Sequence, residues 1–429
     1  MKHLILSFLL LFSFYAYSND TITVMQYNLL YYGINNSWCN SSNNNIESKD
    51  HYIRTILNEV KPDILTVCEF GNDKELINHF LDNNLNINNI TSWKASSIIN
   101  NAKSNIINAI FYNSDKINLK KHSVAQSYIR DIDVFELFFN TDDLILGDTI
   151  ELICVVAHLK SSSGSQNENS RKIMIENTLN YLNNNLQNKN ILLMGDFNLY
   201  SSNEDAYQLM TDNILYPDSY FIDPIGDEAT GKWHDNPDFQ SYHTQSTNIK
   251  GNKCRAGGGL DDRFDFIMMS EKISTGNDNI RYINNSYQAL GQDGLHFNNS
   301  INAMPLNSEL PVEVVDALYN NSDHLPIIMK LNINAKVGIH DIPENNFIVE
   351  LFPNPADNYL KINFGISNNA LVKIIVFNIL GEEIITKEIN IINNHNTYNL
   401  NIENLDSGMY FIKICTEDGL LKMMKFIVE

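Results

Sequence analysis

Basic residues are scarce in this chain: 30 lysines and arginines face 51 aspartates and glutamates, which gives a formal net charge of −21. Proteins that bind nucleic acid tightly and without sequence preference rely on a basic surface and on counterion release. The deficit of basic residues therefore argues against that class. It does not exclude an enzyme that holds a phosphate through a cation in a local cleft.

Long apolar runs are missing after the first residues. An apolar stretch at residues 4–14 follows Lys2 and precedes the small-x-small triplet Ala16-Tyr17-Ser18. This pattern is typical of a secretory signal peptide, and the stretch is too short for the alternative, a membrane anchor. We expect a leader at residues 1–18, an exported mature protein, and no stable membrane insertion.

Cysteine is also rare, with five in 429 residues. Cys68, Cys154 and Cys415 lie in strand-like runs and are expected to act as small buried hydrophobes. Cys39 and Cys254 lie in polar loops and could pair in an oxidising compartment, although sequence alone does not establish connectivity. A Cys39–Cys254 disulfide is therefore our hypothesis.

Residues 19–334 contain both short β-branched runs, typical of strands, and apolar patterns with helical spacing. Strands come in adjacent pairs as often as they alternate with helices, which favours an α+β fold of two packed mixed sheets with outer helices. The expected strands are residues 22–29, 63–68, 106–112, 133–139, 149–157, 189–194, 263–269 and 325–331. The expected helices are residues 52–60, 73–85 and 171–186.

Three other regions have a different character. Residues 200–259 and 287–318 are long and irregular, and we expect substrate-shaping loops there. Residues 335–346 are expected to form a linker. Residues 347–429 show short alternating strands with regular turn signals, which predicts a small all-β sandwich.

Polar residues stand at or near the ends of the expected strands, where enzymes commonly gather a site. Each one alone is more often a turn residue, a surface charge or a structural partner. The ordered set indicates a hard-metal phosphoryl site. Its members are Asn28, Glu69, His158, Asp196, Asn198, Asp265, Asp323 and His324, with Arg130 as an added candidate.

Hydrolysis of a phosphodiester needs a cation, a base and stabilisation of the leaving oxygen. Glu69 fits the main carboxylate ligand of a Mg²⁺-type ion, with Asn28 and Asp323 in support. His324 fits the general base, with Asp265 as the residue that orients its ring.

The remaining candidates would hold the water and the phosphate. Asp196 and Asn198 are two positions apart, so they share a face of an extended segment and could grip both. His158 could donate a hydrogen bond to a phosphate oxygen, and Arg130 could add a charge-assisted contact. Arg263 is expected to make a structural salt bridge. The choice between Asp196 and His324 as the base stays open.

This set resembles the endonuclease/exonuclease/phosphatase superfamily, which includes DNase I, over residues 21–333. The resemblance implies a four-layered α/β sandwich and phosphoester hydrolysis that depends on Mg²⁺, or alternatively Mn²⁺ or Ca²⁺. It implies metal binding at Glu69, acid/base work by His324 with Asp265, and phosphate contacts at His158, Asp196 and Asn198. The motifs that carry it are Gln26-Tyr27-Asn28, Cys68-Glu69, Ala157-His158-Leu159, Gly195-Asp196-Phe197-Asn198, Arg263-Phe264-Asp265 and Ser322-Asp323-His324.

The C-terminal module resembles the sorting domain of the type IX secretion system. The resemblance implies export by the type IX machinery to the exterior or the cell surface; the alternative is a carbohydrate- or partner-binding sandwich. The residues that carry it are Phe352-Pro353-Asn354-Pro355-Ala356, Asn378-Ile379-Leu380-Gly381, Leu405-Asp406-Ser407-Gly408-Met409-Tyr410 and the closing residues 422–429.

These features together predict a secreted, monomeric, metal-dependent nuclease with DNA or RNA as its substrate. The alternative is a secreted phosphodiesterase or phosphatase that acts on phospholipid head groups or small phosphoesters. An exposed aromatic loop would favour lipid, and Tyr216, Tyr220, Phe221 and Trp233 are the candidates for it. A non-enzymatic adhesin is disfavoured because no candidate site residue is missing.

Overall fold

The computed structural model describes residues 16–141, 149–337, 348–365, 370–378, 382–391, 397–416 and 421–429. These residues divide into a larger compact unit, Tyr17–Lys336, and a smaller one within Val337–Glu429. The expected leader lies outside the described residues except for residues 16–18, and the expected linker does so except for residues 335–337.

Two mixed sheets form the larger unit. The first has the order β11-β13-β1-β2-β4-β3, with β12 paired to β13, and the second has the order β5-β6-β7-β8-β10-β9. The first sheet consists of β1 (Ala16–Tyr32), β2 (Ile64–Gly71), β3 (Trp93–Ala95), β4 (Ile106–Asn113), β11 (Ile280–Tyr282), β12 (Gln288–Ala289) and β13 (Ile327–Val337). The second consists of β5 (Ile117–Gln126), β6 (Ile132–Phe139), β7 (Glu151–His158), β8 (Ile191–Asp196), β9 (Phe221–Ile222) and β10 (Asp265–Ser270).

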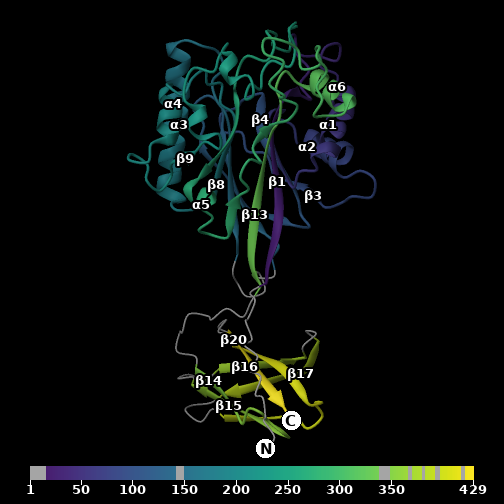
Figure 1. Ribbon diagram of the computed structural model, residues 1–429, viewed down its shortest axis with the longest axis vertical. Helices are drawn as coiled ribbons and strands as arrows, with labels where there is room; N and C mark the ends of the chain where they lie inside the picture. The colour runs from purple at the N-terminus through teal and green to yellow at the C-terminus, as the bar shows by residue number, and fades with distance from the viewer. Residues whose placement is uncertain are drawn as a thin grey trace, which may run out of the picture. The chain divides into compact units, whose positions relative to one another are not determined.

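Helices lie outside the two sheets, with α1, α2 and α6 on one side and α3 and α4 on the other (Figure 1). This four-layered α/β sandwich is the predicted fold. A π-helical turn, Leu81–Leu85, continues α2, and 3₁₀ turns lie at Gly226–Ala229 and Pro237–Phe239. The helices are α1 (Ile46–Val60), α2 (Lys74–Phe80), α3 (Ser165–Asn185), α4 (Asp205–Thr211), α5 (Glu271–Thr275) and α6 (Val312–Asn321).

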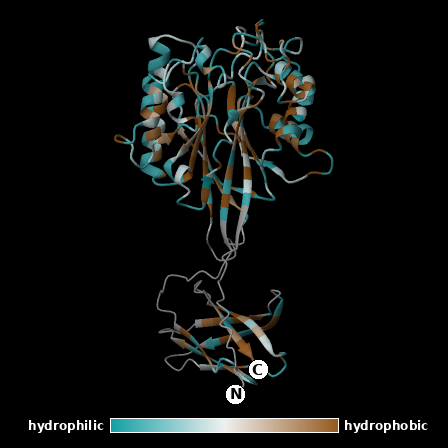
Figure 2. Cartoon of the chain, viewed as in Figure 1, coloured by the Kyte–Doolittle hydropathy of each residue, from teal (hydrophilic) through white to brown (hydrophobic). Residues whose placement is uncertain are grey.

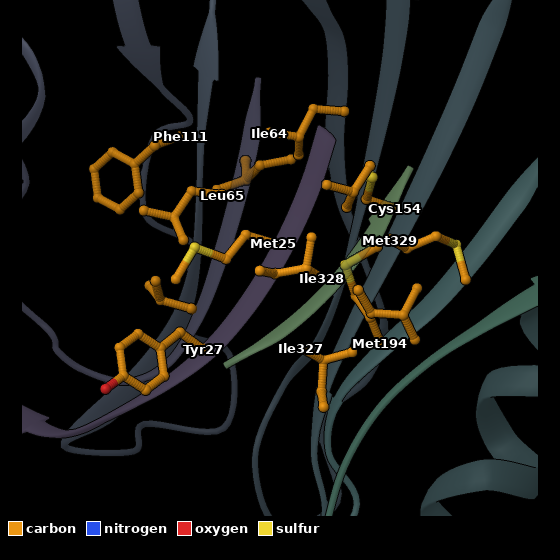
Figure 3. Close-up of a cluster of buried hydrophobic side chains, with 14 of the residues drawn as sticks. Met25, Tyr27, Ile64, Leu65, Phe111, Cys154, Met194, Ile327, Ile328 and Met329 are labelled. Atoms are coloured by element: carbon orange, nitrogen blue, oxygen red, sulfur yellow. The ribbon is translucent and has the colours of Figure 1, made fainter. Parts of the chain in front are cut away.

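Apolar side chains pack between and around the sheets, and Figure 2 shows hydrophobic colour concentrated in the central strands. Met25 of the first sheet belongs to the same buried cluster as Cys154 and Met194 of the second, which shows that the sheets pack face to face (Figure 3). A second buried cluster joins the second sheet to α3, through residues such as Ile175 and Leu179. The apolar residues predicted at helical spacing in α3 therefore face the core.

The structure differs from the expectation in the two long segments, at helix starts and in β5, a strand that was not expected. Both α4 and α6 form inside segments predicted to be irregular. In α6, Val314 and Leu318 lie one helical turn apart and are both buried, so tertiary packing stabilises a helix within a polar context. The first long helix begins at Ile46, because the side chain of Asn45 caps it by accepting a hydrogen bond from the amide of Ser48.

The smaller unit is an all-β sandwich, as predicted. It has a sheet of order β14-β15-β18 and another of order β17-β16-β19-β20. Leu360, Ile374 and Ile412 lie in one buried cluster between them. The strands are β14 (Ile348–Phe352), β15 (Tyr359–Gly365), β16 (Ala370–Phe377), β17 (Glu383–Ile391), β18 (Thr397–Asn401), β19 (Gly408–Thr416) and β20 (Leu421–Val428).

Candidate active site

The candidate residues meet where two parallel strand pairs end. In the second sheet, Asp196 is in register with His158 across β7 and β8, and with Asp265 across β8 and β10. In the first sheet, Asn28 is in register with Cys68, the residue before Glu69. Because the sheets pack face to face, these strand ends bring the predicted side chains into one site.

Gly195 sets the position of Asp196. Its φ is +143°, and a Cβ there would lie 1.8 Å from the carbonyl oxygen of Ala157 on the neighbouring strand. Only glycine permits this close approach and this backbone conformation. The end of β8 thereby places Asp196 beside His158.

His324 and Asp265 form a buried pair. Nδ1 of His324 lies 2.7 Å from Oδ2 of Asp265, and the hydroxyl of Thr244 donates to the same oxygen at 2.7 Å. On the other side of the ring, Nε2 lies 2.7 Å from the side-chain amide of Gln245 and 3.8 Å from Oδ2 of Asp196. The ring is thus fixed by Asp265 and turned towards Asp196.

The carboxylate of Asp196 is held by two asparagines. Nδ2 of Asn28 donates to its Oδ2 at 3.0 Å, and Nδ2 of Asn198 donates to its Oδ1 at 2.8 Å. Asn198 has a φ of +51°, a left-handed conformation that asparagine tolerates. Nε2 of His158 lies 3.6 Å from Oδ2 of Asp196 and 3.7 Å from Oε1 of Glu69.

Glu69 and Asp323 complete the acidic wall of the site. Oε2 of Glu69 accepts a hydrogen bond from the amide of Tyr31 at 3.2 Å. Oδ2 of Asp323 accepts one from the amide of Ala256 at 2.6 Å. Oδ1 of Asp323 is buried and has no hydrogen-bond partner among the described residues.

Burial and mutual repulsion shift the pKa values of these groups. Burial raises the pKa of Glu69, and the charge of Asp323 adds to the effect. Burial raises the pKa of Asp196 to about 7, with Asp265 and Glu69 acting in the same direction against the charge of His324. A crowded set of buried carboxylates gains free energy when a cation neutralises it.

The two histidines respond in opposite directions. Burial lowers the pKa of His158 well below its usual value, and the positive charges of Arg130 and His324 act in the same direction. Burial opposes protonation of His324 too, but the charges of Asp265 and Asp196 raise its pKa well above its usual value. These directions favour the neutral form of His158 and the protonated form of His324.

The donor set fits a divalent cation. Ligand atoms of Glu69, His158 and Asp196 all lie within 4.8 Å of one another, so the carboxylates of Glu69 and Asp196 can hold a cation beside the ring of His158. Oxygen-rich sites of this kind suit Mg²⁺-type ions. In the loops, His234, Asp261 and Asp262 form another group whose ligand atoms lie within 4.8 Å of one another.

Two arginines differ in what they contact. The guanidinium of Arg130 donates to the backbone oxygens of His158 and Leu159, at 3.3 and 2.8 Å, and so borders the site. Arg263 makes two 2.9 Å hydrogen bonds to the carboxylate of Asp223, and both side chains are buried. The predicted structural role of Arg263 is thus confirmed.

Thr244 and Gln245 contact Asp265 and His324, respectively, but were not predicted from the sequence. Both belong to the long segment 200–259, in which neither hydrophobic periodicity nor a motif marks them. The segment reaches the site through backbone pairing, because the amide of Leu325 donates to the oxygen of Thr244 at 2.8 Å. Only the tertiary path of this loop reveals their position.

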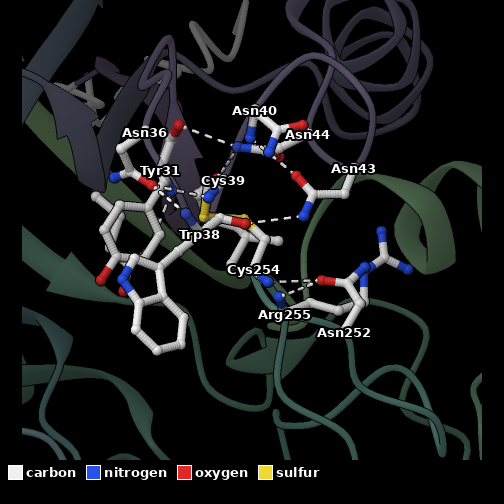
Figure 4. Close-up of a disulfide and its surroundings, with 12 residues drawn as sticks. Tyr31, Asn36, Trp38, Cys39, Asn40, Asn43, Asn44, Asn252, Cys254 and Arg255 are labelled. Atoms are coloured by element: carbon white, nitrogen blue, oxygen red, sulfur yellow. Dashed lines mark hydrogen bonds between the residues drawn. A yellow bond between two sulfur atoms is a disulfide. The ribbon is translucent and has the colours of Figure 1, made fainter.

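The hypothesis of a Cys39–Cys254 disulfide is confirmed: the two Cα atoms lie 4.7 Å apart with the sulfurs bonded (Figure 4). Cys68 and Cys154 are free and buried, as expected. Cys415 is free but only partly buried, so it differs from that expectation. Within the described part of the chain, none of the helices combines the length and apolar character that a membrane crossing requires.

The family described as the secretion system C-terminal sorting domain matches residues 350–429. This match confirms the predicted sorting domain. No curated protein matches this chain.

Solved structures with similar folds include three of interest. The human Nocturnin catalytic domain with bound sulfate is 14% identical, covers 74% of this chain and 98% of its own, and has a TM-score of 0.45. The D. rerio TDP2 complex with single-strand DNA product is 11% identical, with coverage of 73% and 99% and a TM-score of 0.43. An endonuclease/exonuclease/phosphatase from Beutenbergia cavernae is 10% identical, with coverage of 95% and 99% and a TM-score of 0.38.

Proposed function

We propose that this chain is a secreted, divalent-metal-dependent phosphodiester hydrolase of the endonuclease/exonuclease/phosphatase superfamily, with nucleic acid as its substrate. One observation carries the proposal: the imidazole of His324 is bonded to buried Asp265 at 2.7 Å and faces Asp196 at 3.8 Å. A ring fixed on one side and directed at a second carboxylate is suited to proton transfer. The acidic wall with Glu69 supplies the complementary cation site.

The directions of the pKa shifts support one division of the two proton-transfer roles. When water attacks phosphorus, it must lose a proton, and the leaving oxygen gains one as its bond to phosphorus breaks. Asp196, with a pKa of about 7, can accept the proton of the water near neutral pH. The charges of Asp265 and Asp196 raise the pKa of His324, which favours its protonated form, and that form can donate a proton to the leaving oxygen. This assignment makes Asp196 the base and His324 the acid.

The remaining residues hold these two groups and the phosphate. Asn28 and Asn198 orient the carboxylate of Asp196, and neutral His158 has a ring N–H to offer to a phosphate oxygen. Glu69 would hold the cation as its main carboxylate ligand, with Asn28 and Asp323 in support. When bound, an ion of the Mg²⁺ type neutralises the phosphate and stabilises charge on the leaving oxygen.

Nucleic acid is favoured over lipid by the placement of the loop aromatics. Of the four aromatics that would have formed an exposed lipid-binding loop, Tyr216, Phe221 and Trp233 are buried and Tyr220 is partly buried. Hydrolysis of phospholipid head groups or small phosphoesters remains the second candidate. The sorting-domain match at residues 350–429 supports export, and the leader at residues 1–18 would serve the first translocation step.

Supercoiled plasmid and a single-stranded oligonucleotide, each with Mg²⁺ or with excess EDTA, test the proposal on the full chain. We expect cleavage that requires the metal and is lost in His324→Ala. His51→Ala, which alters an exposed histidine on α1, is the matched control and should retain activity. If His324→Ala cleaves at the wild-type rate, the proposed mechanism is wrong. If only sphingomyelin or a small phosphodiester is hydrolysed, the second candidate replaces the first.

A further inference from the structure

The loop between β1 and α1 presents an exposed tryptophan. Trp38 is 65% exposed, whereas Trp233 is fully buried. A single exposed apolar side chain is common on protein surfaces and needs no explanation by itself. Trp38 differs because hydrogen bonds and a disulfide hold its loop and connect it to residues that bind Glu69 and Asp323.

Side-chain hydrogen bonds and the disulfide hold the backbone of Trp38 in place. Oδ1 of Asn36 accepts from the amides of Trp38 and Cys39, both at 2.8 Å. Nδ2 of Asn43 donates to the carbonyl oxygen of Trp38 at 2.8 Å. The next residue, Cys39, is 1% exposed and bonded to Cys254. An aromatic ring on such a preorganised loop loses little entropy when a ligand binds to it.

The same loop reaches the acidic wall on two routes. On the first, Nδ2 of Asn44 donates to the carbonyl oxygen of Tyr31 at 3.1 Å, and the amide of Tyr31 donates to Glu69 at 3.2 Å. On the second, Cys254 is two residues before Ala256, whose amide donates to Asp323 at 2.6 Å.

Figure 4 shows the rings of Tyr31 and Trp38 extending from the loop in the same direction. Because Asn44 of this loop donates to Tyr31, whose amide donates to Glu69, the loop that carries Trp38 borders the candidate site.

We propose that Trp38 is a stacking platform for an unpaired base next to the scissile phosphate, so that the substrate is single-stranded nucleic acid. The inference rests on the proposed function and names the substrate class of that same site. Stacking on an aromatic ring accepts any base, and it requires the base to leave its paired neighbours. It also supplies affinity without basic surface, which suits a chain of net charge −21.

The surroundings of Trp38 favour a base over a membrane. Its neighbours Asn36, Asn40 and Asn43 are polar and bonded within the loop. A membrane-binding surface needs a contiguous apolar patch with basic residues around it. One planar ring set among amides is suited to one planar ligand.

The test compares a single-stranded oligonucleotide with an abasic strand of the same length, which keeps every phosphodiester but has no base to stack. In Trp38→Ala we expect KM for the normal strand to rise about 10- to 100-fold, with kcat little changed and the abasic strand unaffected. Trp38→Phe should recover most of the loss. Ile214→Ala is the control, because Ile214 is an apolar side chain that is 89% exposed. Its segment is bonded near the start of β8, the end opposite Asp196, where the amide of Asn188 donates to the oxygen of Asp218.

Binding is measured separately from hydrolysis. In EDTA, the oligonucleotide should quench the tryptophan fluorescence of the wild type, and the quenching should disappear in Trp38→Phe. An unchanged KM in Trp38→Ala, or an equal rise for both strands, would overturn the role of Trp38 while leaving the hydrolase proposal intact. A fluorescence response to phospholipid vesicles and none to the oligonucleotide would overturn it in favour of a membrane contact. A wild type that cleaves no nucleic acid would overturn both proposals.

Discussion

Asn28 and Asp196 are 168 positions apart in the chain and belong to different sheets, yet Nδ2 of Asn28 donates to Oδ2 of Asp196 at 3.0 Å. The bond ties the end of β1 to the end of β8. It also lowers the pKa of Asp196, against the larger effect of burial. One amide thereby links the packing of the two sheets to the protonation of the proposed base.

Asn28→Ala should lower kcat/KM for a single-stranded oligonucleotide by about 10- to 100-fold, because a hydrogen bond to a charged acceptor contributes about 1.5–3 kcal/mol. Without the amide, the pKa of Asp196 rises further and less of the carboxylate is available as a base at pH 7. Asn185→Ala on α3, which removes a comparable 2.8 Å bond to the carbonyl of Tyr181, is the control. Equal kcat/KM values for the Asn28 variant and the wild type would contradict this role.

Asp265→Asn should reduce kcat by about 10³-fold or more, since the amide no longer holds His324 in the required tautomer and charge state. Asp293→Asn is the matched control. It alters a His–Asp pair of almost the same length, 2.8 Å between Asp293 and His296, in which His296 lies outside the proposed site. If both substitutions reduce kcat to the same extent, the loss reflects general destabilisation.

The sequence predicted the part of the site that lies on strands, because strand ends follow from local patterns of apolar residues. Asn28, His158 and Asp196 could be expected to converge for that reason. Thr244 and Gln245 could not, since their segment carries no periodic signal and its path depends on pairing with residues near His324. The helix α6 is a different case, because Val314, Val315 and Leu318 have helical apolar spacing that the sequence offered and the prediction missed.

Reduction of the Cys39–Cys254 bond, or Cys39→Ser, should destabilise the larger unit. The bond closes a loop of 215 residues, and the chain-entropy estimate for a loop of this size is about 5.4 kcal/mol, an upper value for real disulfides. The Tm with and without a reductant gives the effect, and Cys415→Ser, which alters a free thiol, controls for loss of a sulfur. A Tm that does not respond to reductant would contradict the prediction.

His296 provides a pH-dependent test of stability away from the proposed site. Nδ1 lies 2.8 Å from Asp293, and Nε2 lies 2.9 Å from the oxygen of Pro305 and 3.1 Å from that of Ala303. Every partner is an acceptor, so both ring nitrogens must carry protons. Burial alone would lower the pKa of His296, but the bond to Asp293 and the two carbonyls raise it.

A raised pKa in the folded state stabilises the protein fully below the unfolded pKa of about 6.5. That contribution is lost as the pH rises through the folded value, because a neutral ring can donate from only one nitrogen. His296→Gln should therefore lower the free energy of unfolding by about 1 kcal/mol or more at pH 6, and by less at pH 9. Urea unfolding of wild type and variant at both pH values measures the difference in their free energies of unfolding. His324 is present in both proteins, so its own pH dependence cancels in this difference. A difference that stays constant with pH would show that folding does not raise the pKa of His296.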